Sequence, residues 1–156
     1  YLMGERSPIN DTNARGTFTG MTMDTTRGDM TLAVLEGVAF AIRDSFEVAR
    51  SIGVEIPRSF ICGGGSRSAL WRRIMANVLG IPLDIPATEQ GPGYGAAMLA
   101  MVACGEFASV KEAAAALVRV TDTVEPEREL AERYDERYSR FSKIYPACKE
   151  LFAEIV

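Results

Sequence analysis

The stretch from residue 58 to residue 86, RSFICGGGSRSALWRRIMANVLGIPLDIP, decides the fold of this chain. A short apolar run, Phe60 to Cys62, leads into three consecutive glycines, Gly63 to Gly65. Apolar residues with helical spacing follow at Leu70, Trp71, Ile74, Met75, Val78 and Leu79. Gly80 ends that helix, and Ile81 to Ile85 is typical of a short strand. The unit is therefore a strand, a glycine turn, a helix and a second strand.

The glycine turn has two interpretations, and the residues alone leave both open. Glycine allows positive φ and lets a ligand approach the backbone, because no Cβ stands in the way. The N–H groups and the positive dipole end at a helix start favour an anion such as phosphate. A tight strand-to-helix turn that binds nothing explains the same residues. Neither the GxxxxGK[ST] nor the GxGxxG spacing is present.

Composition places the chain among soluble globular proteins of about one domain. It has 156 residues, of which 47% are hydrophobic and 24% charged, and a net charge of −4. No cluster of lysine and arginine stands out, so we expect no nucleic-acid partner. No apolar run approaches the roughly 20 residues that a membrane span needs, so we expect no membrane partner.

Histidine and cysteine limit the chemistry further. The chain has no histidine, which excludes a Ser-His-Asp or Cys-His site and any histidine-ligated metal within it. The three cysteines, Cys62, Cys104 and Cys148, form no CxxC pair and read as reduced thiols of a cytoplasmic protein. We assign no metal ligand, and acid–base catalysis would fall to carboxylates or to residues outside the chain.

Helix starts are marked by capping residues. Ser66 or Ser68 can cap the helix after the glycines, because a serine oxygen accepts a bond from a free backbone N–H. Asp29 is the expected cap of a long helix nearer the N-terminus. Ser109 and Glu112 have the spacing of a capping box.

The other expected elements, in chain order, are a strand over 17–23, a helix over 29–51, a second glycine loop over 88–95, helices over 96–104 and 113–120, and a final charged helix after residue 125. Gly37 suggests a close contact between the first helix and a sheet. The helix over 96–104 is apolar on every side, so we expect it to be fully buried. Strands and helices alternate, which predicts an α/β fold.

Several separate motifs agree in order and spacing with the FGGY carbohydrate kinases. The segments that carry the resemblance are GTFTGM at 16–21, DM at 29–30, AVLE at 33–36 and GGGSRSALW at 63–71. Three more, GERSP at 4–8, DTNARG at 11–16 and GPGYGAA at 91–97, most resemble the xylulokinase branch of that family. The resemblance runs from Tyr1 to about Pro146.

The resemblance implies an actin-like, ribonuclease-H-like ATPase domain. Residues 1–156 would form the C-terminal, nucleotide-binding portion, and the N-terminal sugar-binding lobe with its general-base aspartate would lie outside this chain. No catalytic residue is therefore assigned here. The family's nucleotide loop maps onto Gly63, Gly64, Gly65, Ser68 and Ala69. The strand over 17–23 would be separated from the other two strands by upstream strands.

The implied function is ATP- and Mg²⁺-dependent phosphorylation of a ketopentose, D-xylulose to D-xylulose 5-phosphate. ATP or ADP and a small sugar would be the partners, the sugar held through the N-terminal lobe, and a homodimer is left open. The alternatives are kinases of ribulose, gluconate or glycerol, and an actin-like nucleotide-binding protein without a sugar. A non-catalytic helical interaction module is a third class. We expect the chain alone to be inactive.

Overall fold

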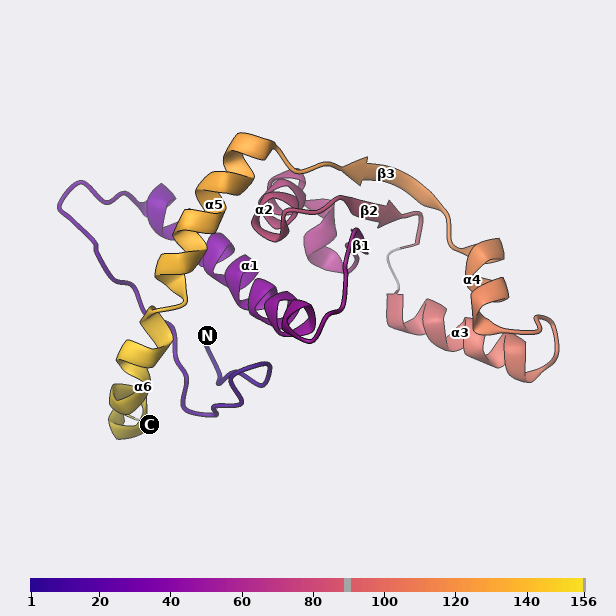
Figure 1. Cartoon of the computed structure of the whole chain (residues 1–156), viewed down its shortest axis with the longest axis horizontal. Coiled ribbons are helices and arrows are strands. Elements are labelled where there is room, and N and C mark those ends of the chain that lie inside the picture. Colours follow the sequence, from indigo (N-terminus) through magenta and orange to yellow (C-terminus); the bar gives the residue numbers. More distant parts are fainter. Residues whose placement is uncertain (89–90, 156) are drawn as a thin grey trace. The chain divides into compact units, whose positions relative to one another are not determined.

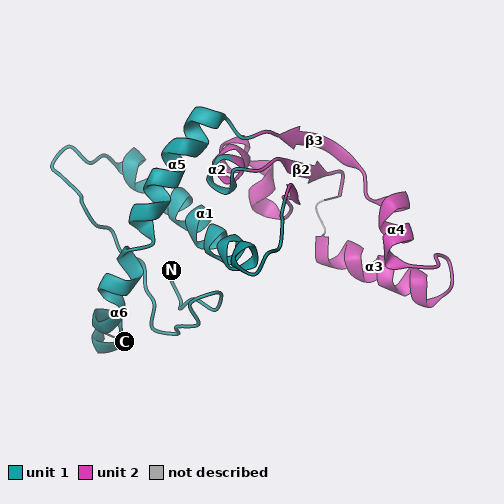
Figure 2. Cartoon of the chain, in the orientation of Figure 1, with its two compact units in different colours: residues 1–56, 77–80, 126–156 teal, residues 57–76, 81–125 magenta. Residues whose placement is uncertain are grey.

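A computed structural model describes residues 1–88 and 91–155 of the chain (Figure 1). Two compact units divide it. Unit 1 comprises residues 1–56, 77–80 and 126–156, and unit 2 comprises residues 57–76 and 81–125 (Figure 2). Within the described part of the chain, no helix is long and apolar enough to cross a membrane.

Unit 2 contains the strand–turn–helix–strand segment and a small sheet. Its elements are β1 (Ser59–Phe60), a 3-10 turn (Gly64–Arg67), the start of α2 (Ala69–Leu79), β2 (Leu83–Pro86), α3 (Gly91–Ala103), α4 (Val110–Leu117) and β3 (Val120–Val124). The strand order is β1-β2-β3, with β1 parallel and β3 antiparallel to β2. The order of strand, glycine turn, helix and strand predicted from the sequence is confirmed.

A buried carboxylate ties the three strands together. Asp84 on β2 is only 5% exposed. Its Oδ1 accepts hydrogen bonds from Arg58, which precedes β1, at 2.9 Å and from the Thr123 hydroxyl on β3 at 2.7 Å. A buried charge is costly unless it is paired and hydrogen-bonded, and Asp84 meets both conditions. This contact fixes the end of β1 that leads into the glycines.

Unit 1 is built around an aromatic cluster between helices α1 (Arg27–Ser51) and α5 (Arg128–Phe141), followed by α6 (Ile144–Ile155). Phe40 on α1 is 5% exposed. Its ring centroid lies 6.0 Å from that of Tyr134, 5.9 Å from Tyr138 and 5.2 Å from Phe141, all on α5. These separations are typical of favourable aromatic pairs, and the cluster forms the centre of this unit.

The predicted helix starts are largely confirmed. Helix α1 begins two residues earlier than expected: Thr26 is its cap, and Asp29 bonds back to Thr26 in a capping box. The Ser68 hydroxyl accepts from Trp71 N at 3.2 Å, so Ser68 caps α2. Ser109 accepts from Glu112 N, whereas the Glu112 carboxylate reaches one residue further back than a capping box requires.

The strand predicted over residues 17–23 is wrong. That segment carries no strand, although its alternating threonines suit an extended backbone. A strand needs a paired neighbour, and no ladder among the described residues includes this segment. The third strand is instead β3, which pairs directly with β2. The expectation that upstream strands separate residues 17–23 from the sheet therefore loses its basis in this chain.

Two expectations about glycines and burial are also wrong. Residues 91–95 of the predicted second glycine loop belong to α3, while residues 89 and 90 lie outside the described residues. Helix α3 is apolar on all sides, yet none of its described residues is buried. A Cβ built on Gly37 meets no atom within 4 Å, so this glycine makes no close contact with a sheet.

Candidate functional site

The glycine turn between β1 and α2 is closed by its own backbone and one serine. Gly63 has φ +83°, a conformation that favours glycine. Its carbonyl oxygen accepts two bonds from Ser66, from the backbone N–H at 3.0 Å and from the hydroxyl at 2.7 Å. The Gly65 carbonyl accepts from Ser68 N at 3.0 Å. Ser66 is therefore a buried brace of the turn rather than the helix cap.

The three glycines have three different surroundings. A Cβ on Gly63 would find open space, but its positive φ would strain any other residue. A Cβ on Gly64 would also find no atom within 4 Å, and the Gly64 backbone lies outside the left-handed region. A Cβ on Gly65 would lie 3.1 Å from the Cδ1 and Nε1 atoms of Trp71. Only Gly64 combines an ordinary backbone with free space beside it.

Two backbone donors of the turn are unused. The N–H groups of Gly64 and Gly65 donate to no atom among the described residues, and both glycines are exposed. They stand just before the N-terminus of α2, where the helix dipole is positive. Free N–H groups at such a point are suited to bind the oxygens of an anion. The residues present therefore fit a phosphate group.

All five residues predicted for the nucleotide loop lie in or next to this one turn. Gly63, Gly64, Gly65, Ser68 and Ala69 are exposed and contiguous around the 3-10 turn and the first residue of α2. The hydroxyl of Ser68 is already engaged by Trp71 N, so its contribution to a ligand would come from other atoms.

Sequence reasoning missed two neighbours of the turn. Trp71 was assigned to the apolar stripe of the helix, although its ring packs on Gly65. Cys62 lies against the first residue of α3, because a Cβ on Gly91 would be 3.1 Å from the Cys62 sulfur. The available signal was a large aromatic six residues after a glycine, which the helical periodicity explained equally well.

No carboxylate cluster accompanies the turn. Across residues 1–88 and 91–155, no group of three or more cysteine, aspartate or glutamate side chains could hold a metal ion. Glu36 in unit 1 instead accepts from Tyr134 at 2.9 Å and Arg137 at 2.8 Å, which identifies it as a helix-packing residue, as the sequence suggested.

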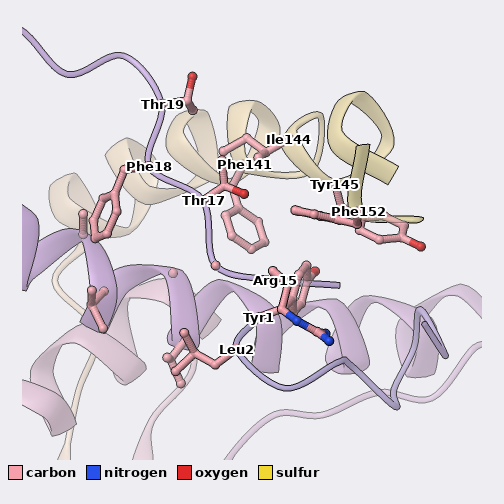
Figure 3. A pocket seen from close by; sticks show the side chains of 15 residues that line it. Tyr1, Leu2, Arg15, Thr17, Phe18, Thr19, Phe141, Ile144, Tyr145 and Phe152 are labelled. Atoms are coloured by element: carbon pink, nitrogen blue, oxygen red, sulfur yellow. The ribbon is translucent and has the colours of Figure 1, made fainter. Parts of the chain in front are cut away.

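Unit 1 has an apolar pocket of about 260 Å³ (Figure 3). The side chains around it that are aromatic or aliphatic include Phe18, Val34, Val38, Phe141, Ile144 and Phe152. The hydroxyl of Tyr145 donates to Asp11, and the guanidinium of Arg15 donates to the carbonyls of Thr12 and Ala14. Because its polar groups are engaged, this pocket is a packing surface and offers no reactive group.

A second polar cluster in unit 1 is structural as well. Asp44 accepts from the hydroxyls of Tyr138 at 2.8 Å and Tyr1 at 3.0 Å. Burial raises the pKa of the Asp44 carboxyl, and the two hydrogen bonds oppose part of that rise. Burial also raises the pKa of both tyrosines. The cluster joins the N-terminal segment to α1 and α5.

Comparison with known proteins gives consistent relatives. The xylulose kinase of Staphylococcus epidermidis is 33% identical over 156 residues, which are 100% of this chain and 32% of that protein. A solved xylulose kinase from Rhodospirillum rubrum matches with a TM-score of 0.81 and 37% identity, over 98% of this chain and 30% of that one. A solved gluconate kinase from Lactobacillus acidophilus matches with a TM-score of 0.92 and 26% identity, over 100% and 32%.

These likenesses confirm the expected fold class, the C-terminal part of an actin-like, ribonuclease-H-like α/β architecture. The chain spans about a third of the length of the relatives it matches. The model of the FGGY family of carbohydrate kinases, C-terminal domain, matches residues 1–104 of the 156. With two thirds of its length matched by that model, this chain belongs to the FGGY family of carbohydrate kinases.

Proposed function

We propose that the intact protein is an ATP-dependent sugar kinase and that the turn at Gly63 to Gly65 binds the phosphates of the nucleotide. The observation that carries this proposal is the pair of unused N–H groups on Gly64 and Gly65, in a chain that belongs to a carbohydrate kinase family. The open space at the Cβ positions of Gly63 and Gly64 supports it, because a phosphate group could approach the backbone there.

The turn would act by positioning and by electrostatics. The Gly64 and Gly65 N–H groups donate to phosphate oxygens, and the N-terminal end of α2 adds its positive dipole. The bonds from Ser66 to the Gly63 carbonyl hold the donors in place before the ligand arrives. ATP with Mg²⁺ supplies the phosphoryl group and neutralises charge during transfer. A carboxylate outside these residues takes the proton from the sugar hydroxyl.

The substrate we propose is a ketopentose, D-xylulose. Relatives named xylulose kinase support this choice. The gluconate kinase among the structural neighbours makes gluconate the main competitor. We further propose that the protein works in the cytoplasm, where ATP is available to it.

A comparison of kcat/KM with ATP over D-xylulose, D-ribulose, glycerol and gluconate tests this function in the intact protein. We expect a clear preference for D-xylulose, because a sugar site that hydrogen-bonds each hydroxyl rejects a mismatched sugar strongly. The 156-residue chain alone serves as a control and should give no phosphorylation. A preference for gluconate or glycerol would overturn the xylulose assignment. ADP binding without phosphorylation of any sugar would favour the actin-like nucleotide-binding protein instead.

A further inference from the structure

We propose that Trp71 is a positioning residue that holds the glycine turn in its nucleotide-binding geometry. This inference rests on the proposed function, because it concerns the same turn. It assigns a role in nucleotide affinity to a side chain that needs no contact with the ligand.

The contact that carries the inference joins the indole to Gly65. Trp71 is half-buried in the first turn of α2. Its Cδ1 and Nε1 atoms lie 3.1 Å from the position that a Cβ on Gly65 would take. A separation this short leaves no room for a side chain, so glycine is needed there because of the tryptophan. The Trp71 backbone N–H donates to Ser68 Oγ at 3.2 Å, which ties this part of the helix to the turn.

The turn is thus held at both of its ends and open in the middle. Ser66 holds the carbonyl of Gly63 with two hydrogen bonds, and Trp71 packs on Gly65. Between them, the Cβ direction of Gly64 meets no atom within 4 Å. The packed glycine and the open glycine are adjacent, so a shift of the indole would move the two free N–H groups.

Rigidity matters here because three consecutive glycines are intrinsically flexible. Glycine loses more backbone freedom on ordering than any other residue. If nothing held the turn, a nucleotide would have to order it on binding, and affinity would fall by that cost. The indole supplies the order in advance. Trp71 therefore contributes to nucleotide affinity through Gly65.

Truncation of the ring tests the role directly. In the intact protein, Trp71→Ala is expected to weaken ADP binding about tenfold, the size expected for one or two groups that must be ordered anew. Trp71→Phe keeps part of the ring against Gly65 and should recover part of that affinity. The KM for ATP should rise more than kcat falls. Phe107→Ala, which removes another half-buried aromatic of unit 2, is the matched control and should leave ADP affinity unchanged.

A double-mutant cycle between Gly65→Ala and Trp71→Ala gives the sharper test, with calorimetric ADP affinity and Tm measured for each variant. In the native background the new Cβ displaces the indole and weakens binding. In the Trp71→Ala background the same Cβ enters vacated space, so it should cost little more. If Trp71→Ala does not fold, Trp71→Phe replaces it in the cycle. Additive losses, or unchanged affinity in the tryptophan variants, would overturn the inference. Failure of the native protein to bind ADP would overturn the proposed function instead.

Discussion

Replacing Gly64 with valine in the intact protein is expected to weaken ADP binding about 10- to 100-fold, the loss of one or two hydrogen bonds to a charged group. The added side chain would occupy the open space beside the turn, where the phosphates are proposed to lie. It meets no protein atom within 4 Å and imposes no positive φ, so the Tm should stay nearly constant. Calorimetric titration with ADP and thermal melting measure the two quantities.

Gly37→Val is the matched control for this variant. Gly37 also has an empty Cβ direction and an ordinary backbone, but it lies on α1 in unit 1. We expect the control to keep native ADP affinity. If Gly64→Val also binds ADP as the native protein does, the turn is only a structural connection between β1 and α2.

Phe40→Ala is expected to cause the largest loss of stability, about 3–5 kcal/mol in the free energy of unfolding of unit 1. The ring is 5% exposed and contacts three aromatic rings of α5, so its removal leaves a cavity between the two helices. Urea unfolding followed by circular dichroism measures the change.

Phe18→Ala is the control for the aromatic cluster. Phe18 is 48% exposed at the rim of the apolar pocket, so its truncation should change the free energy of unfolding by less than about 1 kcal/mol. Equal losses for the two phenylalanines would show that the α1–α5 cluster is not the centre of unit 1.

The sequence predicted best the elements whose signals are local. Glycine, a capping serine and a helical stripe follow one another between residues 60 and 80, and each acts within a few residues. The strand, turn, helix and strand of unit 2 were therefore predictable. Helix α1 was predictable for the same reason, because its apolar spacing extends over many turns.

The elements that depend on distant partners were not predictable. Residues 17–23 have the composition of a strand and lack a paired neighbour, whereas Val120–Val124 is mostly exposed and becomes a strand by pairing with β2. Periodicity likewise predicted a buried α3, but burial depends on what packs against a helix. Within the site, the sequence could not distinguish Gly64 from Gly65, because their difference is the position of the Trp71 ring.

Hydrogen exchange of the intact protein with and without saturating ADP tests the central claim most directly. The account predicts slower exchange in peptides that cover residues 62–69, because the unused N–H groups of Gly64 and Gly65 would become hydrogen-bonded to phosphate. Peptides that cover residues 33–38, at the apolar pocket of unit 1, should exchange as before. Unchanged exchange over residues 62–69 under saturating ADP, or slowing confined to residues 33–38, would contradict it.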